Sequence, residues 1–397
     1  MRARPSTAAA RTAHEPLLAT PVAKVVTAAP IDTLVRPEIR SLRAYQVPDA
    51  TGLIKLDAME NPYGWPEALR QDWLNALRDA ELNRYPDPRA SELQSVLREA
   101  MAIPPGMGVL LGNGSDELIQ MLALAVAAPG STSTDQRTLL SLDPGFVMYR
   151  MIGLFAGLKY VGVNLDADDF SLDLGATLSA IRDSQPLLTF IAYPNNPTGN
   201  LFDPAAIEQI IAASPGLVIV DEAYAPFTDA SFMPRLGEWP NLLVMRTVSK
   251  MGLAGLRLGY LVGPEEWIEQ IDKIRLPYNI NVLSQASAAF ALRHRDVLDE
   301  QTRAICDERA RLARSLAELD GSRGRLTPYP SDANFILVRV APGRADPIFS
   351  DLRERGILIK NLNGAHPLLS DCLRITVGHP DENARLIESL ASILDSR

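Results

Sequence analysis

The feature that most constrains the fold is a series of short apolar segments in the middle of the chain. The segments cover residues 109–128 (strand, turn and helix), 187–200, 216–224, 241–250 and 256–263, and helical stretches separate them. In the first four, a polar motif follows the apolar strand. Near-continuous apolar strands that alternate with helices predict a mostly parallel sheet with helices on both faces, an α/β fold. Ligands bind at the carboxyl ends of such strands, so we expect the functional residues in these polar motifs.

Lys250 follows the predicted strand 242–245 after a short polar turn, and Arg257 lies seven residues further along. An amine held partly out of water has a lowered pKa and can form an imine with an aldehyde. The neighbouring hydroxyl of Ser249 and the arginine suit a phosphate. An aldehyde that carries a phosphate is pyridoxal 5'-phosphate, so the motif favours this cofactor. The alternative is a solvated lysine in a turn punctuated by glycines.

Two further motifs offer groups for other edges of such a cofactor. Asp221 ends a predicted buried strand and needs a cationic partner. A protonated ring nitrogen would be that partner, and the pairing would keep the ring an electron sink. Tyr224 and Asn196 could hydrogen-bond the phenolic oxygen. Taken alone, residues 221–224 favour a helix-capping aspartate with a packed tyrosine, and residues 195–199 also fit an ordinary turn.

The phosphate and the ring face have candidates as well. Residues 112–117 lie between a predicted strand and a helix, so the backbone N–H groups near Ser115 and Asp116 could hold a phosphate at the helix N-terminus. Ser115 would otherwise be an N-cap. Phe146 follows another strand and could stack on a flat ring, although a core aromatic fits the same pattern.

The composition excludes several classes of protein. The chain has 397 residues, enough for two or three domains, and its net charge of −9 argues against a nucleic-acid binder. Two cysteines and four scattered histidines show no disulfide or metal-ligand spacing, so we expect no metal. No apolar run is long enough to span a membrane, and we expect no membrane partner.

The chain is expected to have four parts. Residues 1–35 form a flexible N-terminal arm, because the stretch to residue 30 is rich in Ala, Pro and Thr and has one acidic residue, Glu15; a transit peptide is the alternative. Residues 36–66 join the small domain, and 67–285 form the large cofactor-binding domain. Residues 286–397 form a small α+β domain that contains a long charged helix near 294–319.

In this order, the motifs resemble those of the fold-type I pyridoxal-phosphate-dependent aminotransferases, and most of all the histidinol-phosphate aminotransferases. The resemblance runs from about Arg36 to the C-terminus. The residues that carry it are Leu56–Gly64, Asn83–Pro88, Gly112–Glu117, Asn195–Gly199, Asp221–Tyr224, Ser249–Lys250, Ser331–Leu337 and Cys372–Gly378.

The resemblance implies a large domain with a mostly parallel central sheet, a smaller α+β domain, and a cytoplasmic homodimer with shared active sites. It also implies a reaction of histidine biosynthesis. An amino group would move between histidinol phosphate and 2-oxoglutarate or glutamate, giving imidazole acetol phosphate.

The resemblance further implies a role for each candidate residue. Lys250 would bind the cofactor aldehyde and shuttle the proton, while Asp221 faces the ring nitrogen. Tyr224 and Asn196 would hold the phenolic oxygen, and Phe146 would stack on the ring. The phosphate would contact Ser115, Asp116, Ser249, Arg257 and, from the neighbouring subunit, Tyr85. The substrate anion would contact Tyr45, Asn196, Lys360 and Arg374. Arginine can grip a phosphate or a carboxylate bidentately, so Arg374 could serve both substrates.

The sequence departs from some members of the family in three places. Lys360 stands where an arginine is frequent, Phe146 replaces a frequent tyrosine, and the step from Lys250 to Arg257 is seven residues where some members have eight. A threonine-phosphate decarboxylase and an aromatic-amino-acid aminotransferase share the implied fold and remain alternatives. A transcriptional regulator with an aminotransferase-like domain would need a DNA-binding domain, for which the N-terminal arm is too short.

Overall fold

The computed structural model describes residues 31–42, 44, 47–128, 137–320 and 325–395. The chain divides into two units, residues 1–46 and residues 47–397. The described part of the first unit holds two short helices, α1 (Ile31–Leu34) and α2 (Pro37–Arg40). Most of the predicted N-terminal arm therefore lies outside the described residues. Across the described part of the chain, no helix combines the length and apolar character that a membrane crossing needs.

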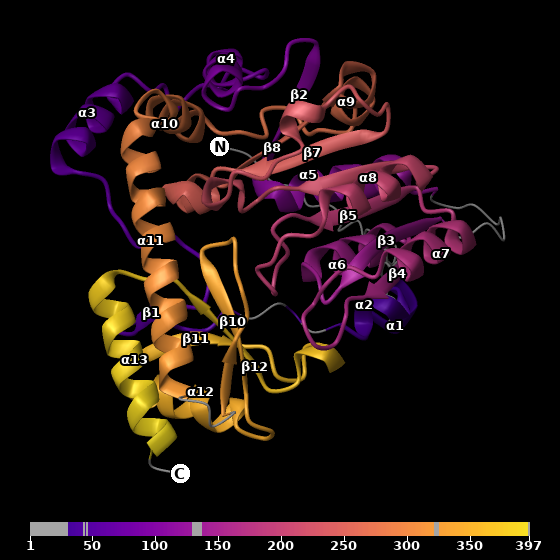
Figure 1. Ribbon diagram of the computed structural model, residues 1–397. Coiled ribbons are helices and arrows are strands. Elements are labelled where there is room, and N and C mark those ends of the chain that lie inside the picture. Colours follow the sequence, from indigo (N-terminus) through magenta and orange to yellow (C-terminus); the bar gives the residue numbers. More distant parts are fainter. Residues whose placement is uncertain (1–30, 43, 45–46, 129–136, 321–324, 396–397) are drawn as a thin grey trace, which may run out of the picture. The chain divides into compact units, whose positions relative to one another are not determined.

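A seven-stranded sheet organises the larger part of the second unit (Figure 1). Its spatial order is β2 (Met107–Asn113), β8 (Leu258–Pro264), β7 (Leu242–Thr247), β6 (Leu217–Asp221), β5 (Leu188–Ala192), β3 (Thr138–Asp143) and β4 (Lys159–Asn164). The pairs from β7 to β4 are parallel, whereas β8 runs antiparallel to both β7 and β2. The predicted mostly parallel α/β sheet is confirmed.

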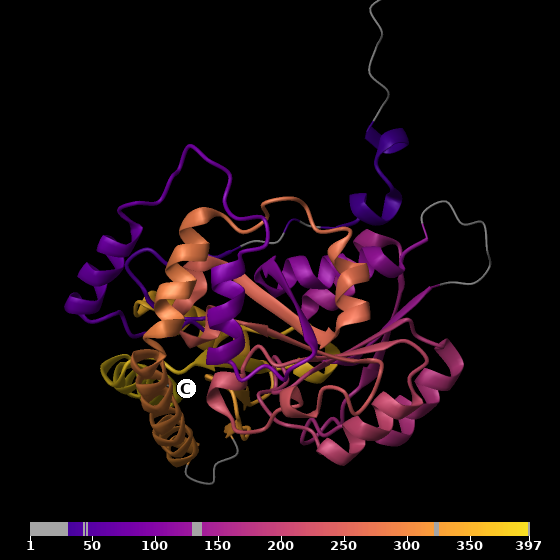
Figure 2. The same ribbon diagram turned by 90° about the horizontal axis from the view of Figure 1, so that it is seen from above.

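Helices cover both faces of this sheet, which explains why the central strands β5 and β6 are buried along their whole length (Figure 2). On β6, Val218 and Val220 belong to one core cluster and Ile219 to another, because successive side chains of a strand point to opposite faces. One face packs against α5 (Gly114–Val126), α6 (Val147–Ala156) and α9 (Glu265–Asp272). The other packs against α4 (Ser91–Ala100), α7 (Leu174–Ser184), α8 (Pro204–Ala213) and α10 (Val282–Arg293).

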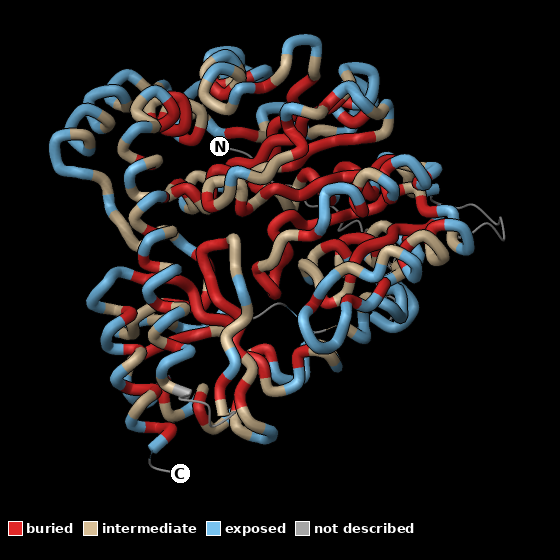
Figure 3. The backbone as a smooth tube through the Cα atoms, viewed as in Figure 1, coloured by how far each residue is buried: buried red, intermediate tan, exposed pale blue. Residues whose placement is uncertain are grey.

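A second, five-stranded sheet has its own core. Its order is β1 (Ile54–Leu56), β11 (Ile357–Asn361), β12 (Cys372–Thr376), β10 (Phe335–Val340) and β9 (Leu326–Pro328). Only the β1–β11 pair is parallel. Helices α11 (Arg295–Asp320), α12 (Ala345–Glu354) and α13 (Pro380–Asp395) contribute to its core. Figure 3 shows both sheets as buried strands surrounded by half-exposed helices.

The two sheets correspond in sequence to the predicted large and small domains, with β1 from the N-terminal segment paired in the small sheet. The long charged helix expected near 294–319 is α11. Helix α10 runs through the predicted boundary at 285/286 and packs against α4 and α3 (Glu67–Leu77). The domain boundaries themselves stay a prediction.

Candidate active site

One cavity at the carboxyl edge of the large sheet gathers nine of the predicted residues. These are Ser115, Asp116, Phe146, Asn196, Asp221, Tyr224, Ser249, Lys250 and Arg257. They come from segments that follow β2, β3, β5, β6 and β7, and from the turn before β8. Strands that run in parallel end at one edge of a sheet, which is why residues far apart in the sequence meet here.

Lys250 lies in a turn of π-helix, Ser249–Leu253, just after β7. Gly252 takes a φ of +116° in this turn, a conformation that residues with a Cβ rarely adopt. The Lys250 amine donates a hydrogen bond to the carbonyl oxygen of Ala58 at 3.2 Å. Burial, and after it the positive charge of Arg374, lower the pKa of Lys250 to about 8. A good share of the amine is therefore neutral just above neutral pH, as a nucleophile or base requires.

Asp221 is a buried carboxylate at the end of β6. Its Oδ2 accepts a hydrogen bond from the Tyr149 hydroxyl at 2.5 Å, and its Oδ1 accepts one from the Ala223 N–H at 3.1 Å. Burial raises the pKa of Asp221 to about 6, although both hydrogen bonds act in the opposite direction. Within the described ranges, no salt bridge joins Asp221 to a cation, whereas its neighbour Glu222 has Arg246 at 2.6 Å. The Asp221 carboxylate therefore lines the cavity and can pair with a positively charged group bound there.

Asn196 connects the cavity to the small sheet. Its Oδ1 accepts a hydrogen bond from Arg374 Nη1 at 2.6 Å, and its Nδ2 donates to the Tyr224 hydroxyl oxygen at 3.1 Å. Burial raises the pKa of Tyr224, so its hydroxyl stays protonated. Because the oxygen accepts from Asn196, the hydroxyl hydrogen can be donated to a group in the cavity.

An anion cradle lies at the N-terminus of α5. The first N–H groups of a helix have no partner within it, and here they belong to Gly114, Ser115 and Asp116. Gly114 has a φ of +75°, and a Cβ on it would lie 2.6 Å from Arg257 Nη2. Arg257 contacts Asp116 at 3.4 Å and stays 54% exposed. The seven-residue step from Lys250 to Arg257 therefore brings the guanidinium into the cavity.

Apart from Asn196, which lines the cavity, the substrate-binding candidates lie on the small sheet or outside the described residues. Arg374 is buried on β12, and Lys360 is its register partner on β11. Burial, and after it the charge of Arg374, lower the pKa of Lys360. Arg374 reaches the cavity through Asn196, while Lys360 does not line it. Tyr45 lies outside the described residues.

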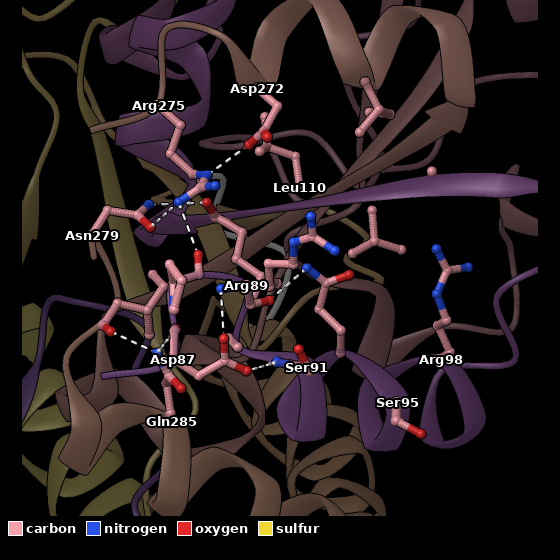
Figure 4. A pocket seen from close by; sticks show the side chains of 18 of the residues that line it. Asp87, Arg89, Ser91, Ser95, Arg98, Leu110, Asp272, Arg275, Asn279 and Gln285 are labelled. Atoms are coloured by element: carbon pink, nitrogen blue, oxygen red, sulfur yellow. Dashed lines mark hydrogen bonds and ion pairs between the residues drawn. The ribbon is translucent and has the colours of Figure 1, made fainter. Parts of the chain in front are cut away.

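Tyr85 does not line the cavity of its own chain. It is 80% exposed, and its ring stacks on Tyr278 with centroids 4.4 Å apart. The loop that carries it borders a second, larger cavity of about 600 Å³ between α4, β2 and α9 (Figure 4). Polar contacts fix this border: Asp87 accepts from the Ser91 N–H at 2.7 Å, and Arg275 donates to the Pro88 carbonyl oxygen at 3.2 Å. Neither Lys250 nor the buried carboxylate of Asp221 lines this larger cavity, so the smaller cavity is the better candidate for the active site.

Sequence reasoning gave no role to six residues that line the smaller cavity: Met59, Tyr149 and Thr247, and the smaller Ala192, Pro194 and Ala223. Phe146 is the N-cap of α6, and Tyr149 lies three residues later in the first turn of this helix. This spacing places the two side chains on the same side of the helix. That spacing could have suggested Tyr149. No local pattern pointed to Met59, whose place depends on contacts with the small sheet.

The fold and this cavity define an aminotransferase-like site, and the chain belongs to the aminotransferases of class I and II, a pyridoxal-phosphate-dependent family whose profile matches residues 51–390. The curated "Histidinol-phosphate aminotransferase 2" of Nitrosococcus oceani is 56% identical over 90% of this chain and 96% of its own length. The protein of the same description from Cupriavidus pinatubonensis is 52% identical over 92% of this chain and 97% of its own.

A solved structure gives the same likeness in three dimensions. The histidinol-phosphate aminotransferase of Sinorhizobium meliloti, crystallised in complex with pyridoxal 5'-phosphate, superposes with a TM-score of 0.79 at 26% identity. The match covers 91% of this chain and 98% of that one. The predicted resemblance and fold class are therefore confirmed.

The residues of the cavity fit the cofactor of this family. A buried carboxylate without a salt bridge in the described chain, Asp221, suits a protonated ring nitrogen. Gly114 leaves room beside Arg257 at a helix N-terminus, which suits a phosphate. The Lys250 amine, partly neutral, suits an aldehyde.

Proposed function

We propose that this chain is a transaminase that moves an amino group between histidinol phosphate and 2-oxoglutarate, as the names of its close relatives suggest. The observation that carries the chemistry is that a partly neutral lysine and a buried carboxylate line one cavity. The product of the first half of the reaction would be imidazole acetol phosphate, with glutamate formed in the second half.

The cofactor would be held at four points by residues of this chain. Pyridoxal 5'-phosphate, when bound, supplies a ring that withdraws electrons from the substrate carbon. Asp221 would hold the proton on the ring nitrogen, and Tyr149 keeps its carboxylate oriented. Tyr224 and Asn196 would hydrogen-bond the phenolic oxygen, and Phe146 would stack on the ring. The phosphate would contact the N–H groups of Ser115 and Asp116, together with Ser249 and Arg257.

Lys250 would carry the proton. Its Nζ would take the proton from the substrate carbon and return it on the cofactor side, which requires the neutral amine as base and the ammonium as acid. A pKa of about 8 makes both forms available near neutral pH. The burial that lowers this pKa also keeps water from the amine.

Arg374 would bind the anionic end of both substrates. Its hydrogen bonds to Asn196 Oδ1 and to the Asp57 carbonyl oxygen fix the plane of the guanidinium without cancelling its charge. Lys360, the register partner of Arg374, adds positive charge. Burial, and after it the charge of Arg374, lower the pKa values of Lys250 and Lys360. This positive field supports a phosphate or a carboxylate as substrate group. Tyr45 and Asn196 would assist.

The activity is tested with purified protein and 2-oxoglutarate. Histidinol phosphate, phosphothreonine and phenylalanine are compared as amino donors, and glutamate formation and carbon dioxide release are both measured. We expect histidinol phosphate to exceed phenylalanine in kcat/KM by roughly ten- to hundredfold, because a charged hydrogen-bonded contact is lost without the phosphate. Carbon dioxide release from phosphothreonine would indicate a decarboxylase, and a preference for phenylalanine would indicate an aromatic-amino-acid aminotransferase.

We also propose a cytoplasmic homodimer with shared active sites, in which Tyr85 contacts the phosphate in the neighbouring subunit. The support is that Tyr85 is 80% exposed and lies beside the exposed Leu82 and the exposed ring of Tyr278. Free thiols at Cys306 and Cys372 fit a reducing compartment, where cell fractionation should find the protein. The division into domains at 36–66, 67–285 and 286–397 is part of this proposal.

Mixing two inactive variants tests the shared site. A Lys250→Ala chain and a Tyr85→Ala chain, unfolded and refolded together, should form mixed dimers in which one site has both residues intact. Activity should then reappear. If Tyr85 acted within its own subunit, mixing would restore nothing, and the shared-site proposal would fail.

A further inference from the structure

The segment Asp57–Met59, which follows β1, makes an unusual set of contacts between the small sheet and the cavity. Its three successive carbonyl oxygens each accept a hydrogen bond from a side chain: Arg374 Nη2 at 3.0 Å, Lys250 Nζ at 3.2 Å and Asn334 Nδ2 at 3.0 Å. The central carbonyl, that of Ala58, is the acceptor for the lysine. We call this segment the carbonyl strap.

The strap needs restraint, because Met59 has a φ of +53°, in the left-handed region that side-chain-bearing residues avoid. Both polar backbone atoms of Met59 are held by the small sheet. Its N–H donates to Thr376 Oγ1 at 3.0 Å, and its carbonyl oxygen accepts from Asn334. Asn334, directly before β10, and Thr376, at the end of β12, are both buried. They are neighbours because Phe335 is the register partner of Thr376.

We propose that Asn334 and Thr376 are positioning residues that keep the Ala58 carbonyl in place as the acceptor for the Lys250 amine whenever this amine is not bonded to the cofactor. Neither residue lines the cavity, so both act through the strap. The inference rests on the proposed role of Lys250 as the base, and it adds a docking point for that base which the cavity residues do not provide.

The charges around Lys250 explain why such an acceptor matters. Arg374 and Arg257 disfavour the ammonium, Glu60 and Asp116 favour it, and burial is the largest effect against it. A carbonyl oxygen bonds an ammonium more strongly than a neutral amine, so the strap stabilises the protonated form. If the strap relaxes, burial and Arg374 still act, and the pKa of Lys250 should fall.

The test measures Lys250 in the full-length chain freed of cofactor, independently of activity. The amine is labelled with fluorodinitrobenzene over a range of pH, and the labelled Lys250 peptide is quantified by mass spectrometry. The wild-type amine should titrate at about 8. Asn334→Ala and Thr376→Val should lower this pKa by roughly one unit, which speeds labelling at neutral pH up to about tenfold. Thr376→Ser keeps the hydroxyl and should restore the wild-type curve.

Asn383→Ala is the matched control. Asn383 is likewise a buried asparagine next to the small sheet, but its side chain bonds Gly378 and Glu308 instead of the strap. Its removal should leave the titration of Lys250 unchanged. Thermal unfolding establishes that each variant is folded, and Thr376→Val, which nearly preserves shape, keeps the test available if Asn334→Ala does not fold.

Two results would overturn the proposal: an unchanged Lys250 titration in Asn334→Ala or in Thr376→Val, or an equal shift in Asn383→Ala. These outcomes are distinct from a failure of the proposed function. Absence of transamination by the wild-type protein would refute the function, and transamination that survives Lys250→Ala would refute the role of the lysine, whereas the labelling result reports only where the amine is held.

Discussion

Replacing Asp221 by asparagine should stabilise the cofactor-free protein while it disables the enzyme. The carboxylate is buried, and the pKa rises from 3.8 to about 6, a rise of about two units. Each unit corresponds to about 1.4 kcal/mol, so ionisation of Asp221 costs the cofactor-free fold about 3 kcal/mol. Asparagine has almost the same shape and can still accept from the Ala223 N–H and bond the Tyr149 hydroxyl.

The sign of the pH dependence follows from the direction of this shift. Between the unfolded pKa near 3.8 and the folded pKa of about 6, the folded protein binds more protons at Asp221 than the unfolded chain does. The wild-type free energy of unfolding should therefore fall as pH rises through this window, and the deficit persists above it. Asp221→Asn should be more stable than wild type at pH 8 by about 2–3 kcal/mol and show no advantage below pH 4.

Urea unfolding of both cofactor-free proteins over this pH range measures the difference. Glu222→Gln is the control, since Glu222 is buried beside Asp221 but has a salt bridge to Arg246 at 2.6 Å and accepts from the Phe232 N–H. Loss of that partner should destabilise the fold by roughly 3 kcal/mol. If Asp221→Asn were destabilised by the same amount at every pH, the reasoning from a buried carboxylate that has no salt bridge in the described chain would be refuted.

Three further outcomes are expected. Lys250→Ala should abolish both turnover and the visible absorbance of bound cofactor; retained catalysis would contradict the role of the lysine. Arg374→Ala should raise KM for histidinol phosphate and for glutamate alike, each by roughly ten- to hundredfold, since a charged hydrogen bond contributes about 1.5–3 kcal/mol; an effect on glutamate alone would argue against a shared anion site. Gly114→Ala places a Cβ 2.6 Å from Arg257 Nη2 at a φ of +75°. This variant should bind the cofactor at least about tenfold more weakly in a fluorescence titration. Gly255→Ala, whose Cβ would have open space around it, should bind the cofactor as the wild type does.

The candidate site could be predicted from sequence where its residues lie next to strand ends. Lys250, Asp221 and Asn196 each follow an apolar strand, and parallel strands end at one edge, so their meeting in one cavity follows from the local pattern. Tyr85 shows the limit of that reasoning. The resemblance implied a phosphate contact in a neighbouring subunit, but no sequence pattern shows that its ring stacks on Tyr278 and does not line the cavity of its own chain.

The sequence by itself determined the alternation of buried strands and helices, and with it the edge at which chemistry occurs. These features repeat over short stretches and depend on local apolar periodicity. The tertiary structure decided the contacts that give the residues their properties. Tyr149 meets Asp221, and Arg374 meets Asn196 across 178 residues of chain. The left-handed Met59 is held by Asn334 and Thr376, which lie far from it in sequence. Such contacts depend on how the two sheets pack their side chains, which no local pattern records.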